Sequence, residues 1–238
     1  MNESTDQRLE TIRNRITQAA RRSGREETAV ELIAVSKGHP PERLAELIDA
    51  DQLVFGESRV QEARSKAPRL PGRARWHLVG HLQSNKIRQA LPLFERIHSV
   101  DSLELANDLN RIAGELGLFP KVLLQVNLAA ESSKYGFAPD RLEADLETLL
   151  ALDRLEIDGL MAIPPLTPDA EGARPFFVKL RMLRDRLAIA AGVPFGELSM
   201  GMSHDFEVAI EEGSTMVRVG TALFGPRERK AWKPEAGE

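Results

Sequence analysis

Apolar residues follow two alternating spacings along the chain. In the first segment, Leu9, Ile12 and Ile16 recur three or four positions apart with charged residues between them, which predicts a helix over about 5–23 that ends near Gly24. From Val30 onward, short and nearly continuous apolar runs alternate with amphipathic segments. Such runs are typical of strands buried on both faces of a parallel sheet.

The pattern predicts a regular series of strands and helices. The strands are expected over 30–37, 53–57, 74–80, 96–100, 121–127, 155–163, 197–201 and 215–225. The helices between them are expected over 40–50, 58–67, 85–92, 102–117, 139–152, 171–192 and 205–213. Ser102 and Gly117 stand where a cap and a stop are needed for the helix over 102–117.

Eight strand-then-helix units are the number that closes a parallel (β/α)8 TIM barrel. An open doubly wound sheet uses the same alternation, but no GxGxxG follows the first strand, so the barrel is favoured. The chain, 1–238, is therefore predicted to be one domain. It would comprise the N-terminal helix, a barrel over about 30–225 and a polar tail over about 226–238, which we expect to fray.

Composition and charge argue against several classes of protein. The formal net charge is −4 without a basic block, which argues against nucleic-acid binding. The absence of cysteine excludes disulfides and thiolate chemistry. No apolar run resembles a signal peptide or reaches the roughly 20 residues of a membrane span. A cytoplasmic protein without membrane or nucleic-acid partners is expected.

Functional groups of a barrel gather at the carboxyl ends of its strands. Lys37 follows the first apolar run there. A partly desolvated lysine loses its proton more easily and becomes a nucleophile for aldehydes. Position alone leaves a solvated loop lysine as the alternative.

An anion site is indicated near the last two strands. Ser203, Gly220 and Thr221 supply hydroxyls and backbone N–H groups where such barrels often bind phosphate. Ser203 would otherwise cap the helix that begins near Asp205. Arg218 lies inside an apolar strand, so it needs a partner in the barrel mouth or a structural ion pair with a carboxylate such as Glu57.

The histidines form no metal-ligand pattern such as HExxH, so no metal site is predicted and structural roles are expected for His77, His81, His98 and His204. The only tyrosine, Tyr135, follows the fifth strand. A surface role is expected for it, although it could reach the barrel mouth.

Five motifs together resemble the pyridoxal phosphate homeostasis protein family, of the YggS or PROSC type. They are AVSKGHP, FGESRVQE, WHLVGHLQSNK, DGLMAIPP and SMGMSHDFEVAIEEGSTMVRVGTALFG, in family order between Val30 and Gly225. The resemblance implies a barrel like the N-terminal domain of alanine racemase. It further implies pyridoxal 5′-phosphate (PLP) as a Schiff base on Lys37, with the phosphate held by Ser203, Gly220 and Thr221 and the pyridine nitrogen facing Arg218. The family usually carries asparagine where this chain has Ser58, which removes any contact of that amide.

The same resemblance implies cofactor storage or delivery without catalytic residues. An arginine at the pyridine nitrogen donates hydrogen bonds and leaves that nitrogen unprotonated, which weakens the cofactor as an electron sink. Because about a dozen residues follow the eighth strand in this sequence, we expect no counterpart of the racemase's second domain. PLP-dependent apo-enzymes are expected as transient partners, and the chain as a monomer or weak dimer. The alternatives are an amino-acid racemase of the same fold and a Schiff-base aldolase without a cofactor.

Overall fold

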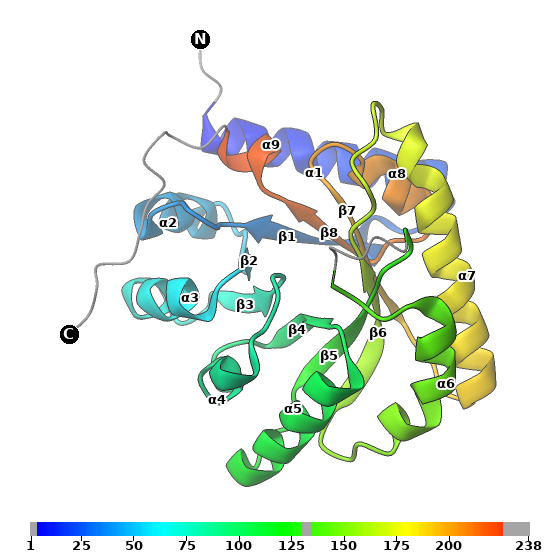
Figure 1. Cartoon of the computed structure of the whole chain (residues 1–238). Helices are drawn as coiled ribbons and strands as arrows, with labels where there is room; N and C mark the ends of the chain where they lie inside the picture. Colours follow the sequence, from blue (N-terminus) through cyan, green and yellow to red (C-terminus); the bar gives the residue numbers. More distant parts are fainter. Residues whose placement is uncertain (1–3, 130–134, 226–238) are drawn as a thin grey trace.

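A closed barrel of parallel strands forms the centre of the computed structural model, which describes residues 4–129 and 135–225 (Figure 1). The strands are β1 (Glu31–Val35), β2 (Val54–Glu57), β3 (Arg75–Leu78), β4 (Arg96–Val100), β5 (Lys121–Val126), β6 (Glu156–Ala162), β7 (Glu197–Met202) and β8 (Met216–Val219). Each strand pairs with the next in sequence, and β8 pairs with β1. The predicted (β/α)8 barrel is confirmed.

Helices surround the barrel. They are α1 (Thr5–Arg22), α2 (Pro41–Asp49), α3 (Val60–Lys66), α4 (Ile87–Ala90), α5 (Leu103–Leu116), α6 (Pro139–Leu150), α7 (Arg174–Ala191), α8 (Phe206–Glu211) and α9 (Thr221–Phe224). Short 3-10 turns add η1 (Glu27–Ala29), η2 (Ala67–Arg69), η3 (Ser84–Lys86) and η4 (Glu171–Ala173). None of the helices in the described ranges is long and apolar enough to cross a membrane.

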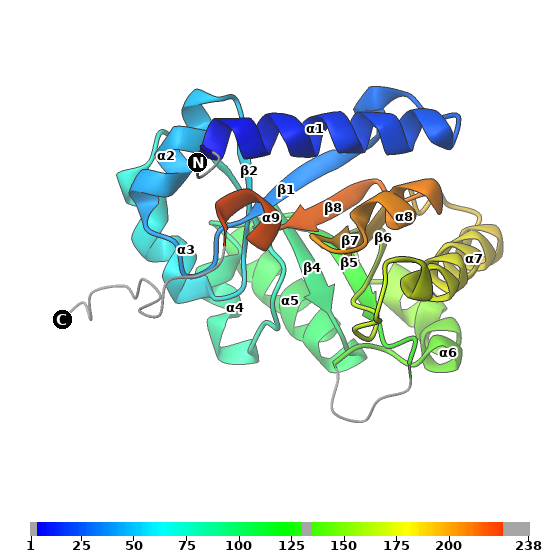
Figure 2. The same ribbon diagram turned by 90° about the horizontal axis from the view of Figure 1, so that it is seen from above.

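The extra N-terminal helix, α1, packs against α2, α8 and α9 on the outside of the barrel (Figure 2). It begins with a capping box, in which the Ser4 hydroxyl accepts from the Gln7 N–H and the Gln7 side chain accepts from the Ser4 N–H. Its buried face includes Leu9, Ile12 and Ile16, as the spacing predicted. The helix thus covers the seam where the first and last strands meet.

Side chains alternate between the inside of the barrel and the helix layer, as strand geometry requires. The interior holds an apolar cluster of Ile33, Val54, Val79, Leu123, Met161 and Met216. A much larger apolar cluster lies between the sheet and the helices. The alternation therefore decides, strand by strand, which residues face the mouth of the barrel.

Two predicted boundaries near the site were wrong. The run over 215–225 is not one strand, since β8 ends at Val219 and Thr221–Phe224 form the short helix α9. The first strand ends at Val35, so Lys37 lies in a turn and not within the strand. A continuous apolar run does not reveal where the strand gives way to α9. At the first strand, the polar residues Ser36 and Lys37 follow the apolar run and belong to the turn. The predicted tail lies outside the described residues.

Candidate functional site

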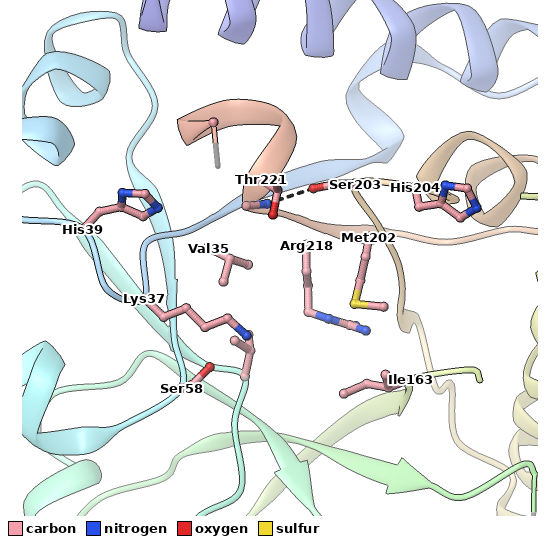
Figure 3. A pocket seen from close by; sticks show the side chains of 13 residues that line it. Val35, Lys37, His39, Ser58, Ile163, Met202, Ser203, His204, Arg218 and Thr221 are labelled. Atoms are coloured by element: carbon pink, nitrogen blue, oxygen red, sulfur yellow. Dashed lines mark hydrogen bonds between the residues drawn. The ribbon is translucent and has the colours of Figure 1, made fainter. Parts of the chain in front are cut away.

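A cavity of about 250 Å³ opens at the carboxyl ends of the strands (Figure 3). Its walls come from the carboxyl ends of β1, β7 and β8 and from the segments that follow β1, β2, β3, β6, β7 and β8. The residues that line it are Val35, Lys37, His39, Ser58, Val79, Ile163, Met202, Ser203, His204, Arg218, Gly220, Thr221 and Gly225. All five residues singled out from the sequence as cofactor-binding candidates therefore line one cavity.

Lys37 enters this cavity from a tight turn. The His39 N–H donates to the Ser36 carbonyl at 3.1 Å, and Gly38 has φ +78°, a combination typical of a type II turn with glycine at its third position. Lys37 follows Ile33 and Val35 at a period of two, and its half-buried side chain extends toward the cavity (Figure 3). The Lys37 side chain therefore lines the cavity and is not directed only into bulk solvent.

Arg218 lies deeper in the same cavity. It shares the inner face of β8 with Met216 and donates to the Ser199 hydroxyl at 2.5 Å and to the Ala162 carbonyl at 2.9 Å. The alternative ion pair with Glu57 is wrong, because Glu57 pairs with Lys66 on the helix side of the sheet. Burial lowers the pKa of Arg218 to about 10, which still leaves it a cation at neutral pH. Its remaining N–H groups are available to an acceptor in the cavity.

Behind Arg218 runs a chain of hydrogen bonds through the barrel interior. Ser199 is 2.8 Å from His98 Nδ1, and His98 Nε2 is 3.1 Å from His77 Nδ1. His77 and His98 were expected to be structural, and these contacts agree with that role. The sequence analysis did not predict that these histidines and Ser199 support Arg218. The alternation of side chains along β3, β4 and β7 nevertheless places all three inside the barrel.

The anion-binding candidates meet where β7 and β8 end. The Ser203 hydroxyl accepts from the Gly220 N–H at 3.3 Å (Figure 3) and from the Ala222 N–H at 3.2 Å. Ser203 does not cap α8, whose N-cap is Asp205, so that alternative is wrong. Because the hydroxyl oxygen already accepts twice, its hydrogen can be donated to a ligand. Thr221 opens α9 beside it.

A stack of two aromatic rings connects the turn that carries Lys37 to the anion-binding corner, as we call Ser203, Gly220 and Thr221 together. The rings of His39 and Phe224 lie 4.5 Å apart between centroids and are inclined by only 16°. His39 belongs to the turn that carries Lys37, and Phe224 belongs to α9. The two sides of the cavity are therefore in direct contact and are packed against each other.

Ser58 lies in the cavity wall, whereas Tyr135 lies on the surface. Ser58 lines the cavity, where its short side chain leaves more room than the amide of the family's usual asparagine. Tyr135 is 57% exposed, and its ring stacks on His81 at 3.8 Å, while His81 Nδ1 is 2.8 Å from the Asp101 carboxylate. The expected surface position of Tyr135 is thus confirmed, and it is not among the residues lining the cavity.

These groups fit an aromatic aldehyde that carries a phosphate. The cavity offers an amine at Lys37, a cation at Arg218 for a ring acceptor, and hydroxyl and turn N–H groups near Ser203 and Thr221 for an anion. Glycine at position 220 lets the end of β8 approach β1 closely, since a Cβ atom there would lie only 3.3 Å from the Val35 carbonyl oxygen. Within the described residues, no group of three or more His, Cys, Asp or Glu side chains could hold a metal ion.

The barrel and this lysine-bearing mouth define the class of protein. The family model of the alanine racemase N-terminal domain matches residues 7–228. A pyridoxal phosphate homeostasis protein from Aquifex aeolicus is 42% identical over 93% of this chain and 98% of its own length. A namesake from Escherichia coli K12 is 40% identical over 92% of this chain and 95% of its own length. The chain belongs to the pyridoxal phosphate homeostasis protein family.

Solved structures agree with this assignment. PipY of Synechococcus elongatus PCC7942, determined with PLP bound, superposes with a TM-score of 0.84 at 43% identity over 93% of this chain and all of PipY. An alanine racemase of Clostridium difficile 630 superposes with a TM-score of 0.70 at 18% identity. The chain spans 57% of that racemase, and the likeness concerns the fold alone.

Proposed function

We propose that this chain binds PLP as a Schiff base on Lys37 and acts in intracellular PLP homeostasis and delivery, as a single PLP-binding domain. One observation carries the proposal. Lys37, Arg218 and the Ser203–Thr221 corner line a single cavity, in a family whose relatives are named for PLP homeostasis. PipY, with PLP bound, supports the choice of cofactor.

Each residue has a distinct task in this proposal. The bound cofactor supplies an aldehyde carbon, with which a neutral amine condenses by losing one water molecule. Lys37 provides that amine from the turn after β1. Arg218 would donate to the ring nitrogen. The Ser203 and Thr221 hydroxyls would donate to the phosphate, while the Gly220 N–H holds the Ser203 hydroxyl in place.

We infer binding without turnover from the chemistry of Arg218. Its guanidinium donates hydrogen bonds and remains charged at neutral pH, so it does not hold a proton on the ring nitrogen as a carboxylate partner would. The support given to Arg218 by Ser199 and the Ala162 carbonyl favours this fixed role. An amino-acid racemase stays the alternative, and a fold likeness alone supports it.

The test is a visible spectrum of the purified protein loaded with PLP. We expect a yellow protein whose band disappears on borohydride reduction, with the reduced adduct found on Lys37 by peptide mass spectrometry. Lys37→Ala should lose the band, whereas Lys121→Ala, an exposed lysine at the start of β5, should keep it. A colourless protein at excess PLP would overturn the proposal.

A second measurement separates binding from turnover. Amino acids are incubated with the loaded protein in deuterium oxide, and exchange at Cα is followed by NMR. We expect no exchange above that of free PLP. Enzyme-like, Lys37-dependent exchange would instead support the racemase.

A further inference from the structure

The turn that carries Lys37 is held from the helix side of the barrel by three buried ionisable residues. We call Glu57, Glu62 and Lys66 the Lys66 cluster. The Lys66 side chain is fully buried, and its Nζ donates to Glu57 Oε1 at 2.6 Å and to Glu62 Oε1 at 2.7 Å. Glu62 and Lys66 lie four residues apart on α3, and Glu57 ends β2.

All three members of the Lys66 cluster bind the turn. The Ser36 hydroxyl donates to Glu57 Oε1 at 2.7 Å, and Lys66 Nζ donates to the Ser36 carbonyl at 2.8 Å. The Gly38 N–H donates to Glu62 Oε1 at 2.6 Å. Lys37 thus lies between two residues that are both hydrogen-bonded to the cluster.

The two faces of the sheet separate this support from the cavity. By strand alternation, Ser36 and Glu57 face α3, whereas Lys37 faces the interior. The Lys66 cluster is absent from the cavity walls and acts only through the backbone and the Ser36 side chain. It can therefore fix the direction of the lysine side chain without touching the ligand.

The charges of the Lys66 cluster are not balanced, although balance would be expected if the cluster only stabilised the fold. Two carboxylates face one ammonium, and Glu57 Oε2 is buried without a hydrogen-bond partner among the described residues. Burial also raises the pKa of Glu57. Buried ion clusters commonly stabilise a fold no better than well-packed apolar residues do. Their strong, directional hydrogen bonds give something that apolar packing does not, namely a defined orientation of the groups they hold.

We propose that Glu62, together with Glu57 and Lys66, positions Lys37 for its condensation with the aldehyde of the ligand. This inference rests on the proposed function of Lys37. In that step the neutral Nζ attacks the aldehyde carbon, a C=N bond replaces the C=O bond, and the oxygen leaves as water. Small displacements of a nucleophile slow such a step strongly. The Lys66 cluster therefore governs the rate of attack, while the anion-binding corner governs non-covalent affinity.

The test compares Glu62→Ala with a matched control in the full-length chain. Glu212→Ala is the control, because its carboxylate is 14% exposed, against 11% for Glu62, and also has two partners, Arg174 and Arg181. Glu212 follows α8 at the opposite end of the barrel. Imine formation with PLP is followed by stopped-flow absorbance, and affinity for pyridoxine 5′-phosphate, which has no aldehyde, is measured by calorimetry.

We expect Glu62→Ala to slow imine formation about tenfold or more, with pyridoxine 5′-phosphate affinity within about twofold of the parent. Glu212→Ala should leave both quantities unchanged. Should Glu62→Ala fail to fold, Glu62→Gln replaces it, because the amide oxygen still accepts from Gly38, and a smaller slowing of about threefold is expected.

Two results would overturn the inference. One is an unchanged rate in the Glu62 variants; the other is an equal loss of affinity for the aldehyde-free analogue, which would make the Lys66 cluster a general support of the cavity. A parent protein that forms no reducible adduct on Lys37 would instead refute the proposed function, so the two failures are distinguishable.

Discussion

The two histidines inside the barrel should make the free energy of unfolding sensitive to mild acid. Burial lowers the pKa of His77 to about 3 and that of His98 well below its ordinary value. Both rings are therefore neutral in the folded protein, whereas in the unfolded chain they bind protons below a pH of about 6.5. Their contribution to stability is complete above that pH and is lost as the pH falls toward the folded pKa values.

The magnitude follows from linkage. For a ring that titrates near pH 6.5 only when unfolded, lowering the pH from about 7.5 to about 5 costs about 2 kcal/mol. His98→Asn removes one such ring. The variant should therefore lose about 2 kcal/mol less stability between these two pH values than the parent does. Groups that respond to pH in the opposite sense, such as Glu57 with its raised pKa, are present in both proteins and cancel in the comparison.

Urea denaturation at the two pH values, followed by circular dichroism, provides the measurement. His204→Asn is the control, because its side chain is exposed and folding removes little water from it. The control should show the parent's pH dependence. The reasoning fails if His98→Asn and the parent lose the same stability on acidification, or if NMR shows a protonated His98 ring in the folded protein at pH 6.

Three further outcomes are expected. Lys66→Met should destabilise the fold by about 3–5 kcal/mol in thermal or urea unfolding, because it leaves two buried carboxylates without their cation, and exposed Lys179→Met should change it by less than about 0.5 kcal/mol. Ser203→Ala should weaken PLP binding about tenfold in a spectral titration, while borohydride reduction should still place the adduct on Lys37. An unchanged affinity would show that the Ser203 hydroxyl does not bind the phosphate. Gly159→Ala should abolish soluble expression, because its Cβ would lie 1.9 Å from the Glu197 carbonyl oxygen on the neighbouring strand; a stable variant would contradict the strand spacing.

The sequence predicted most where local signals agree with one another. The helix over 102–117 is observed as Leu103–Leu116, because the Ser102 hydroxyl accepts from the Leu105 N–H and Gly117 adopts φ +68°. Cap, amphipathic face and stop are all properties of neighbouring residues, so they can be recognised without tertiary contacts. The barrel followed from counting such units.

Features that depend on distant residues were missed. Nothing local distinguishes Lys66 on its helix from a solvated lysine, yet its partners include the carbonyl of Ser36, thirty residues away. The switch from β8 to α9 was hidden in the same way, since Thr221–Phe224 continue the apolar run while the backbone turns. Lys37 and Arg218 could be predicted as site residues because the strand ends of a barrel converge. The support of Arg218 by Ser199 and His98 could not be predicted, because these residues come together only in the closed barrel.

The stack of His39 on Phe224 has a consequence for selectivity. The two rings join the lysine-bearing turn to the short helix α9. If Ser203 and Thr221 hold the phosphate as proposed, contacts within the protein fix the distance between that phosphate site and the Lys37 turn. A molecule is then accepted according to its length. On the proposed function, pyridoxal, which lacks the phosphate, and aldehyde phosphates longer than PLP should both bind more weakly than PLP, although each carries an aldehyde that can react with an amine.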